Sequence, residues 1–129
     1  MRLLLDTHVA IWSVSSSQRL PSGIIDLIAE PENEVFVSIA TIWEIAVKNS
    51  PGRRVKMPFS AAVAAYRFRE FGFATLGIET PQLIALETLP SIHRDPFDRL
   101  LLAQARVAAM QLVTHDQQLA AYGDLVISF

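Results

Sequence analysis

The chain has 129 residues, of which 51% are hydrophobic and 19% are charged, and its formal net charge at pH 7 is −2. These values predict one folded domain over residues 1–129 and exclude a disordered tail, and the absence of cysteine excludes disulfides and thiolate metal ligands. The acidic balance counts against a strongly basic nucleic-acid binder, and no uncharged apolar run approaches the roughly 18 residues of a membrane helix, so we expect a soluble, cytoplasmic protein.

Apolar runs of strand length alternate with longer helical patterns along the chain. This alternation predicts an α/β fold, a three-layer αβα sandwich around a central, mainly parallel sheet of four to five strands. The predicted strands cover residues 2–5, 35–37, 74–78, 111–114 and 125–128. The predicted helices cover residues 8–13, 22–29, 39–49, 59–70, 80–87, 96–109 and 117–122.

Two of these helices carry clear boundary signals. An apolar stripe that includes Ile42 and Val47 runs along the helix at 39–49, and the sequence NSPG at 49–52 ends it. Asp95 followed by Pro96 is typical of an N-cap with proline at the first helical position. The first signal predicts where one helix ends, and the second predicts where another begins.

Four acidic residues stand beside apolar runs of this kind. They are Asp6, Glu44, Asp98 and Asp116. If the runs are parallel strands, the acids lie at strand-to-helix junctions, and in an open α/β sheet the carboxyl ends of the strands line the ligand crevice. Carboxylates gathered in one crevice repel each other unless a cation compensates their charge. Hard divalent cations such as Mg²⁺ or Mn²⁺ prefer oxygen ligands, so the pattern predicts a metal site.

Each acid also has a purely structural interpretation. Asp6 and Asp116 could be N-caps of the helices that follow them. Glu44 could close a capping box with Thr41, or pair with Lys48 four residues later. Asp98 could act on the dipole of its own helix. The common position of the four acids at junctions favours the metal site over four separate structural roles.

A bound divalent ion would acidify water and neutralise charge on a phosphate oxygen, so no side-chain nucleophile is required for phosphodiester hydrolysis. Three hydroxyl residues neighbour the acids and could orient water or a carboxylate, although capping would also explain them. They are Thr7, Ser38 and Thr114.

Four stretches of the chain resemble PIN-domain nucleases, and in particular the VapC-type toxins of bacterial toxin–antitoxin pairs. They are LLDTHVAIW at 4–12, SIATIWEIAVK at 38–48, HRDPFDRLLLAQA at 93–105 and VTHD at 113–116. The stretches follow in order through almost the whole chain. One of them alone is a weak signal, but four in series at suitable spacing are specific.

The resemblance implies a parallel sheet flanked by helices, with Asp6, Glu44, Asp98 and Asp116 as catalytic, metal-binding acids for Mg²⁺ or Mn²⁺. It implies an endoribonuclease that cuts structured RNA such as tRNA or ribosomal RNA. It further implies a homodimer that a small antitoxin inhibits by placing its C-terminal segment in the active-site groove. The RNA target, the preferred metal and the antitoxin's identity are not implied.

Several neighbouring residues are open to more than one interpretation. Asp95 is expected to cap its helix, and whether it or a histidine joins the metal site is left open. Arg94, Arg99, Lys48, Arg53 and Arg54 are expected to contact RNA phosphates, although each basic group could be a solvated surface. The two tryptophans, Trp12 and Trp43, are interpreted as core or dimer surface rather than as base-stacking platforms.

Three other functions compete with the nuclease. A catalytically inactive PIN-like scaffold that binds RNA or protein would not need four acids at the matching positions. A Mg²⁺-dependent, haloacid-dehalogenase-like phosphatase needs a second acid two residues after Asp6, where this chain has His8. A phosphoryl-accepting receiver domain needs a lysine after a late strand, and no lysine follows Lys56.

Overall fold

The computed structural model describes residues 1–54 and 56–129, and its five strands form one sheet. The strands are Arg2–Leu5 (β1), Glu34–Ser38 (β2), Ala74–Leu76 (β3), Gln111–Thr114 (β4) and Val126–Ser128 (β5). Their order is β3-β2-β1-β4-β5, and every neighbouring pair is parallel. The predicted five strands and their parallel arrangement are therefore confirmed, with β1 at the centre.

The helices follow the predicted alternation. The described α-helices are Thr7–Ser15 (α1), Ser22–Ala29 (α2), Ile39–Lys48 (α3), Ala61–Glu70 (α4), Thr80–Ala85 (α5) and Pro96–Ala108 (α6). Three short 3₁₀ helices are Ser17–Arg19 (η1), Leu86–Thr88 (η2) and Gln117–Leu125 (η3). The predicted helix at 117–122 is thus 3₁₀, and Gly123, with a φ of 72°, kinks it.

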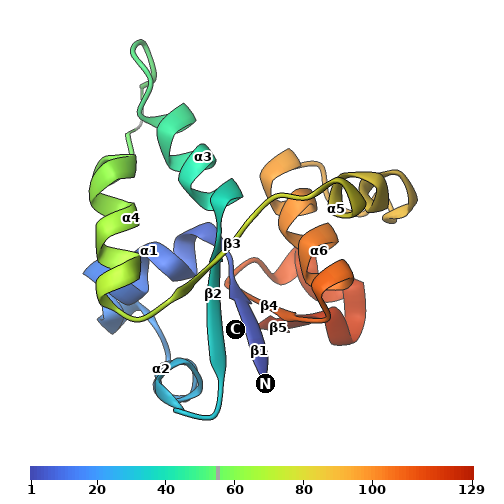
Figure 1. Cartoon of the computed structure of the whole chain (residues 1–129), viewed down its shortest axis with the longest axis horizontal. Helices are drawn as coiled ribbons and strands as arrows, with labels where there is room; N and C mark the ends of the chain where they lie inside the picture. Colours follow the sequence, from blue (N-terminus) through green and yellow to red (C-terminus); the bar gives the residue numbers. More distant parts are fainter. Residues whose placement is uncertain (55) are drawn as a thin grey trace.

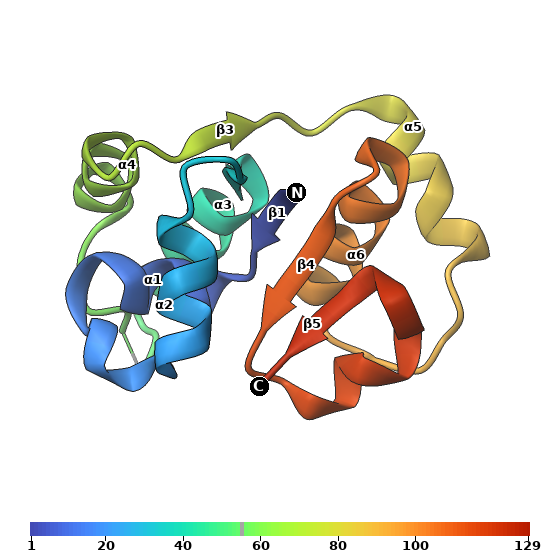
Figure 2. The same ribbon diagram turned by 90° about the horizontal axis from the view of Figure 1, so that it is seen from below.

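The helices cover both faces of the sheet and complete the predicted three layers. Helices α1, α2 and α4 lie on one side of the strands, and α5 and α6 lie on the other (Figure 1). The view from below shows β4 and β5 beside α6, while α1 and α2 pack together on the far side of β1 (Figure 2). The three-layer α/β prediction is confirmed.

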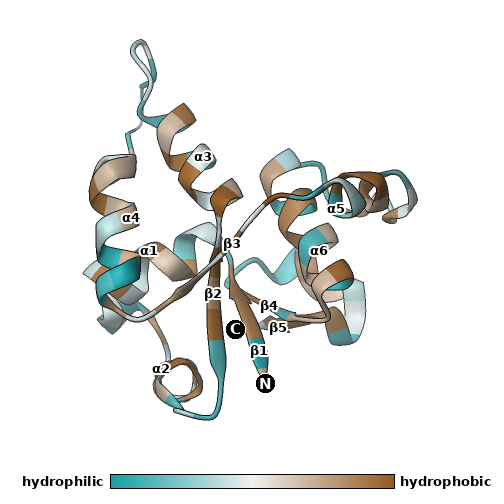
Figure 3. Cartoon of the chain, viewed as in Figure 1, coloured by the Kyte–Doolittle hydropathy of each residue, from teal (hydrophilic) through white to brown (hydrophobic). Residues whose placement is uncertain are grey.

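Alternate side chains of the central strand feed two separate cores. Leu3 and Leu5 pack with residues of α1, α2 and α4, whereas Leu4 packs with residues of α6. All three leucines are fully buried, because successive side chains of a strand point to opposite faces and both faces are covered by helices. Figure 3 shows the resulting brown, hydrophobic ribbon along β1 and β2. The central strand therefore has no solvent-facing side, and its carboxyl end opens onto the helix starts.

Polar side chains at the strand ends begin the next helices. Asp6 follows β1 and caps α1 by accepting the backbone N–H of Val9 at 2.9 Å. Ser38 ends β2 and caps α3 by accepting the N–H of Ala40 at 2.9 Å. The alternative capping box of Thr41 with Glu44 is therefore wrong, because α3 begins two residues before Thr41.

No helix in residues 1–54 or 56–129 combines the length and apolar character that a membrane crossing requires.

Candidate metal centre

The carboxyl ends of the three central strands meet at one edge of the sheet. Leu5 of β1 is in register with Val37 of β2 and Val113 of β4, and the N–H of Asp6 donates to the carbonyl of Val113 at 3.0 Å. A hollow of about 450 Å³ opens at this edge. Its lining residues are Asp6, His8, Trp12, Glu44, Lys48, His93, Asp95, Asp98, His115 and Asp116. The four acids predicted from the sequence are all among them.

Hydrogen bonds hold Asp6 in place and connect it to a second acid of the site. Its side chain is buried, one carboxylate oxygen accepts the N–H of Val9, and the other accepts the hydroxyl of Thr114 at the end of β4. The Thr114 hydroxyl in turn accepts the N–H of Asp116 at 3.0 Å. One threonine therefore links the acid after β1 to the acid after β4.

Glu44 is equally buried and is held from both sides. Thr7 donates its hydroxyl to one Glu44 oxygen at 2.7 Å, and the hydroxyls of Thr7 and Thr41 lie 3.1 Å apart. The ammonium of Lys48 lies 2.6 Å from the other Glu44 oxygen. The sequence-based ion pair of Glu44 with Lys48 is confirmed, and Thr7 supports a site carboxylate as expected.

The imidazole of His93 lies between the carboxylates of Asp98 and Asp116. Nε2 of His93 lies 2.9 Å from an oxygen of Asp98 and 3.5 Å from an oxygen of Asp116. One ligand atom from each of these three residues falls within 4.8 Å of the others, which is the spacing of a potential metal site. Asp95 also lines the hollow, but its side chain accepts the N–H groups of Phe97 and Asp98 as the N-cap of α6. The capping role expected for Asp95 is confirmed.

Burial and mutual repulsion oppose ionisation at this site. Burial raises the pKa of the Asp6 carboxyl to about 6, against its hydrogen bonds from Thr114 and Val9 and with added repulsion from Glu44 and Asp116. Burial and the charge of Asp95 likewise raise the pKa of Asp98 to about 6, although the hydrogen bond from His93 acts in the opposite direction. The fold therefore assembles carboxylates that need a positive charge beside them.

The residues present fit a divalent cation. Carboxylate oxygens dominate the set, one imidazole nitrogen lies among them, and cysteine is absent, which suits Mg²⁺ or Mn²⁺ better than a thiolate-seeking metal. Lys48 is the single lysine or arginine in the lining, and its ammonium is engaged by Glu44. A cation bound in the hollow would offset the burial and the repulsion that raise the pKa of Asp6 and Asp98.

Two residues predicted for the site lie elsewhere. Ser38 donates to the buried amide oxygen of Gln104 at 2.6 Å, so its hydroxyl serves α3 and α6 rather than the acids. Arg99 donates to the backbone carbonyls of Leu86, Leu89, Pro90 and His93, at 3.1–3.4 Å. Its guanidinium holds the loop before α6, which corrects the expectation that it flanks the acids to contact phosphate.

The remaining basic residues predicted for RNA divide into two groups. Arg53 and Arg54 line a second hollow of about 370 Å³ together with His8, Lys48, Lys56 and Met57. His8 and Lys48 also line the acid hollow, so the two hollows adjoin. Arg94 is exposed and lines neither of them.

Sequence reasoning gave too little weight to the aromatic part of the site. His93 bridges two acids, and Trp12, expected in the core or a dimer surface, packs against the core and also lines the acid hollow with His8 and His115. The available signal was that each histidine stands within two residues of a site acid or of Asp95. The tryptophan gave no such signal, because the apolar pattern of α1 does not show which end of the helix reaches the strand edge.

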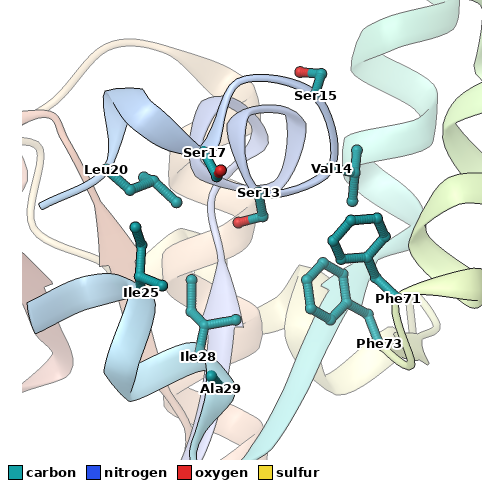
Figure 4. A pocket seen from close by; sticks show the side chains of 10 residues that line it. All are labelled: Ser13, Val14, Ser15, Ser17, Leu20, Ile25, Ile28, Ala29, Phe71 and Phe73. Carbon is teal, nitrogen blue, oxygen red and sulfur yellow. The ribbon is translucent and has the colours of Figure 1, made fainter. Parts of the chain in front are cut away.

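An apolar groove of about 590 Å³ lies at the carboxyl-terminal end of α1. Its apolar lining comes from α1, from Leu20 after η1, from α2, and from the segment after α4. Figure 4 shows Phe71 and Phe73 facing the groove from one side and Ile25 and Ile28 from another. Phe71 is 57% exposed and Ile25 is 38% exposed, so both contribute apolar surface to solvent.

The raised pKa values predict how the metal-free protein responds to pH. A carboxyl whose pKa is about 6 when folded and 3.8 when unfolded stabilises the fold while protonated, and this stability is lost as the pH rises from about 4 through 6. At pH 7.5 the ionised Asp6 alone costs about 3 kcal/mol. In EDTA, Asp6→Asn is therefore expected to raise the free energy of unfolding at pH 7.5 and to change it little at pH 4, as measured by urea denaturation.

The matched control for this experiment is Asp26→Asn, which changes an exposed aspartate on α2. It is expected to leave the free energy of unfolding unchanged at both pH values. If Asp6→Asn destabilises the metal-free protein at pH 7.5 as much as at pH 4, the carboxylate is not under repulsive strain.

Comparison with known proteins places this chain in a family. A model of the PIN domain matches residues 3–125. The structure of VapBC2 from Rickettsia felis bound to a promoter DNA fragment is 13% identical, with a TM-score of 0.69 over 100% of this chain and 98% of that chain. DNA-bound VapBC from Salmonella typhimurium is 14% identical, with a TM-score of 0.67 over 99% of this chain and 98% of that chain.

A toxin–antitoxin complex from Klebsiella pneumoniae is 20% identical, with a TM-score of 0.61 over 97% of this chain and 95% of that chain. No curated protein matches the sequence significantly. These structures share the fold over nearly their whole length, and the family model covers almost all of the sequence. The resemblance seen in the four sequence stretches is confirmed: the chain belongs to the PIN-domain family.

Proposed function

We propose that this chain is a metal-dependent endoribonuclease and the toxin of a toxin–antitoxin pair. One observation carries the proposal: Asp6, Glu44, Asp98 and Asp116 come from four separate segments and line a single hollow at the carboxyl edge of the sheet. Membership of the PIN-domain family and the shared fold with VapBC complexes support the same function.

The four acids would hold Mg²⁺ or Mn²⁺, with His93 as a further neighbour of Asp98 and Asp116. Such a cation, when bound, lowers the pKa of water and neutralises charge on a phosphate oxygen. The chain's own contribution is to fix the carboxylates: Thr114 and the Val9 N–H orient Asp6, and Thr7 and Lys48 orient Glu44. Fixed orientation removes the cost of reorganising these groups during the reaction.

Water is the nucleophile that the lining of the hollow allows. Among the described residues, no serine, threonine or cysteine lines the hollow, and the nearby hydroxyls of Thr7 and Thr114 are donated to Glu44 and Asp6. An intermediate esterified to a serine or threonine hydroxyl therefore has no source among the described residues that line the hollow. The reaction that fits is hydrolysis of a phosphodiester bond.

Basic residues beside the acids would bind the flanking phosphates of the RNA. Lys48, Arg53 and Arg54 line the hollow that adjoins the acids, and their charge suits a phosphate backbone. The exposed Arg94 stays a candidate contact from the loop before α6. An inactive scaffold or a phosphatase-like domain fits less well, because either would leave the strained acid cluster or the extended basic hollow without a use.

A cleavage assay tests this function directly. The purified chain is incubated with a pool of structured RNA in 5 mM MgCl₂, MnCl₂ or EDTA, and products are separated on denaturing gels (concentrations on the order of cellular Mg²⁺). We expect cleavage with either metal and none in EDTA. Asp6→Asn and Asp98→Asn are each expected to reduce the rate by about 10²–10⁴-fold, because each removes a negative ligand from the site.

Two controls separate the competing functions. Asp26→Asn, on the exposed face of α2, should cut RNA at the wild-type rate. A small phosphate monoester should release no phosphate. RNA that stays intact in both metals, while Asp26→Asn and wild-type protein are folded by circular dichroism, would leave only the scaffold function.

We further propose that the apolar groove beside α1 and α2 binds the antitoxin. The groove presents Ile25, Ile28, Phe71 and Phe73, which an apolar helix or strand of a partner would cover. The exposure of Phe71 and Ile25 supports an interface, because a complex is stabilised when a partner covers exposed apolar side chains of this kind. Ser13 and Ser15 of α1 line the groove, while Trp12 of the same helix lines the acid hollow, so one partner could reach both. The expected homodimer stays a prediction.

Growth rescue tests the groove. Cells that express the chain are expected to stop growing, and co-expression of its cognate antitoxin is expected to restore growth. Phe71→Ser should keep the toxin active but reduce rescue, because it removes the most exposed ring of the groove. Tyr66→Ser is the matched control, since Tyr66 is 56% exposed on α4 outside the groove. Equal rescue of both variants would place the antitoxin elsewhere.

A further inference from the structure

An aromatic row borders the acid hollow. The ring centres of His8 and Trp12 lie 5.9 Å apart at an interplanar angle of 53°, and those of Trp12 and His115 lie 5.4 Å apart at 67°. We call His8, Trp12 and His115 the aromatic row. Phe129 extends it beyond His115, with ring centres 5.0 Å apart. His8 and Trp12 lie on α1 and His115 directly follows β4, and these two elements meet beside Asp6; Phe129 follows β5.

The core accounts for only one member of the aromatic row, because Trp12 packs against the core cluster that contains Val9 while the two histidines do not belong to it. His8 and His115 are exposed, and Trp12 is only partly buried. The guanidinium of Arg19 lies 4.8 Å from the centre of the Trp12 ring and fixes its position from outside the hollow. The row therefore offers the exposed ring surface of His8 and His115 to a ligand.

The surroundings of the aromatic row indicate which ligand it takes. All three of its residues line the acid hollow, where a phosphodiester would be cut. His8 also lines the basic hollow with Arg53, Arg54 and Lys56. Rings beside a basic groove are how proteins bind single-stranded nucleic acid, because the bases stack on the rings while the cations follow the phosphates.

We propose that the aromatic row binds the base of an unpaired nucleotide next to the phosphodiester that the acids address. The proposal deepens the proposed nuclease function and rests on it for the identity of the strand. The exposed imidazoles of His8 and His115 supply the stacking surface, and Trp12 contacts both rings. In a duplex, both faces of each base are already stacked on neighbours, so the row cannot engage a paired base. The enzyme is therefore specific for loops and other unpaired segments.

Binding measured without cleavage tests this subsite. All titrations are done in EDTA with a short fluorescent RNA, by anisotropy, so that affinity is separated from catalysis. Three probes share one sequence: the single strand, the same strand annealed to its complement, and a strand that lacks one central base. We expect the single strand to bind most tightly. His8→Ala and Trp12→Ala should each weaken it by about tenfold, within the range measured for loss of one base–aromatic stack.

Control variants separate stacking from charge and from misfolding. His8→Phe keeps a ring without an imidazole and should restore most of the affinity that His8→Ala loses. Tyr66→Ala removes an exposed ring of α4 that lines neither hollow, and should leave the affinity unchanged. His115→Phe is preferred to His115→Ala because it keeps a ring at position 115 against Trp12 and Phe129; both changes remove the hydrogen bond between Nδ1 and the Phe129 carbonyl oxygen, 2.8 Å away.

The fluorescence of Trp12 also reports whether RNA binds to the aromatic row. With Trp43→Phe, Trp12 is the one tryptophan left, and its fluorescence should be quenched by the single strand but not by the duplex. The proposal is overturned if His8→Ala and Trp12→Ala bind the single strand as wild type does, or lose equal affinity for all three probes. It is also overturned if Trp12 responds to the cognate antitoxin and to no oligonucleotide, which would assign the aromatic row to a protein partner.

These outcomes are distinct from failure of the nuclease function. RNA that is cut in Mg²⁺ by His8→Ala and wild type alike, with unchanged affinity, would remove the base subsite and leave the nuclease. Base-dependent binding in EDTA with no cleavage in any metal would keep the subsite and remove the nuclease.

Discussion

The burial of carboxylates beside one another, with the loss of hydration first and mutual repulsion second, is the constraint around which this molecule is organised. Asp6 and Asp98 lose hydration where other acids already stand, and burial is the main reason that the pKa of each rises to about 6. The fold tolerates this arrangement because the surrounding framework is rigid: β1 is covered on both faces, and Thr114 and the α1 backbone bind Asp6 directly. Acids that served only as helix caps would not need to share one hollow.

Much of the fold follows from local patterns in the sequence. Each predicted strand overlaps an observed one, because strands buried on both faces leave continuous apolar runs such as residues 3–5. Helix starts were equally readable where a polar cap stands, as at Asp95 before α6. The 3₁₀ form of η3 was not readable, because its kink depends on the positive φ of Gly123 rather than on an apolar period.

The candidate site was predictable in its acids but not in their surroundings. Asp6 and Asp116 could be found because they follow β1 and β4 and strand ends converge in a parallel sheet. Glu44 lies within α3 and Asp98 in the first turn of α6, so only the resemblance of their stretches located them. Side chains that reach across the structure could not be assigned in the same way: Ser38 binds Gln104, which lies 66 residues later, and Arg99 turns to the carbonyls of the loop behind it. The position of a residue in the sequence indicates the helix, strand or loop on which it lies. The contacts of its side chain depend instead on which elements pack beside it.

The central claim is that the acid hollow binds a divalent cation. Diffraction from crystals grown with MnCl₂, recorded near the manganese absorption edge, tests it without any assumption about substrate. The account predicts an anomalous peak in the hollow lined by Asp6, Asp98 and Asp116, and loss of that peak in Asp6→Asn crystals. Manganese found only at other surfaces, with this hollow empty of anomalous density at pH 7.5, would contradict it.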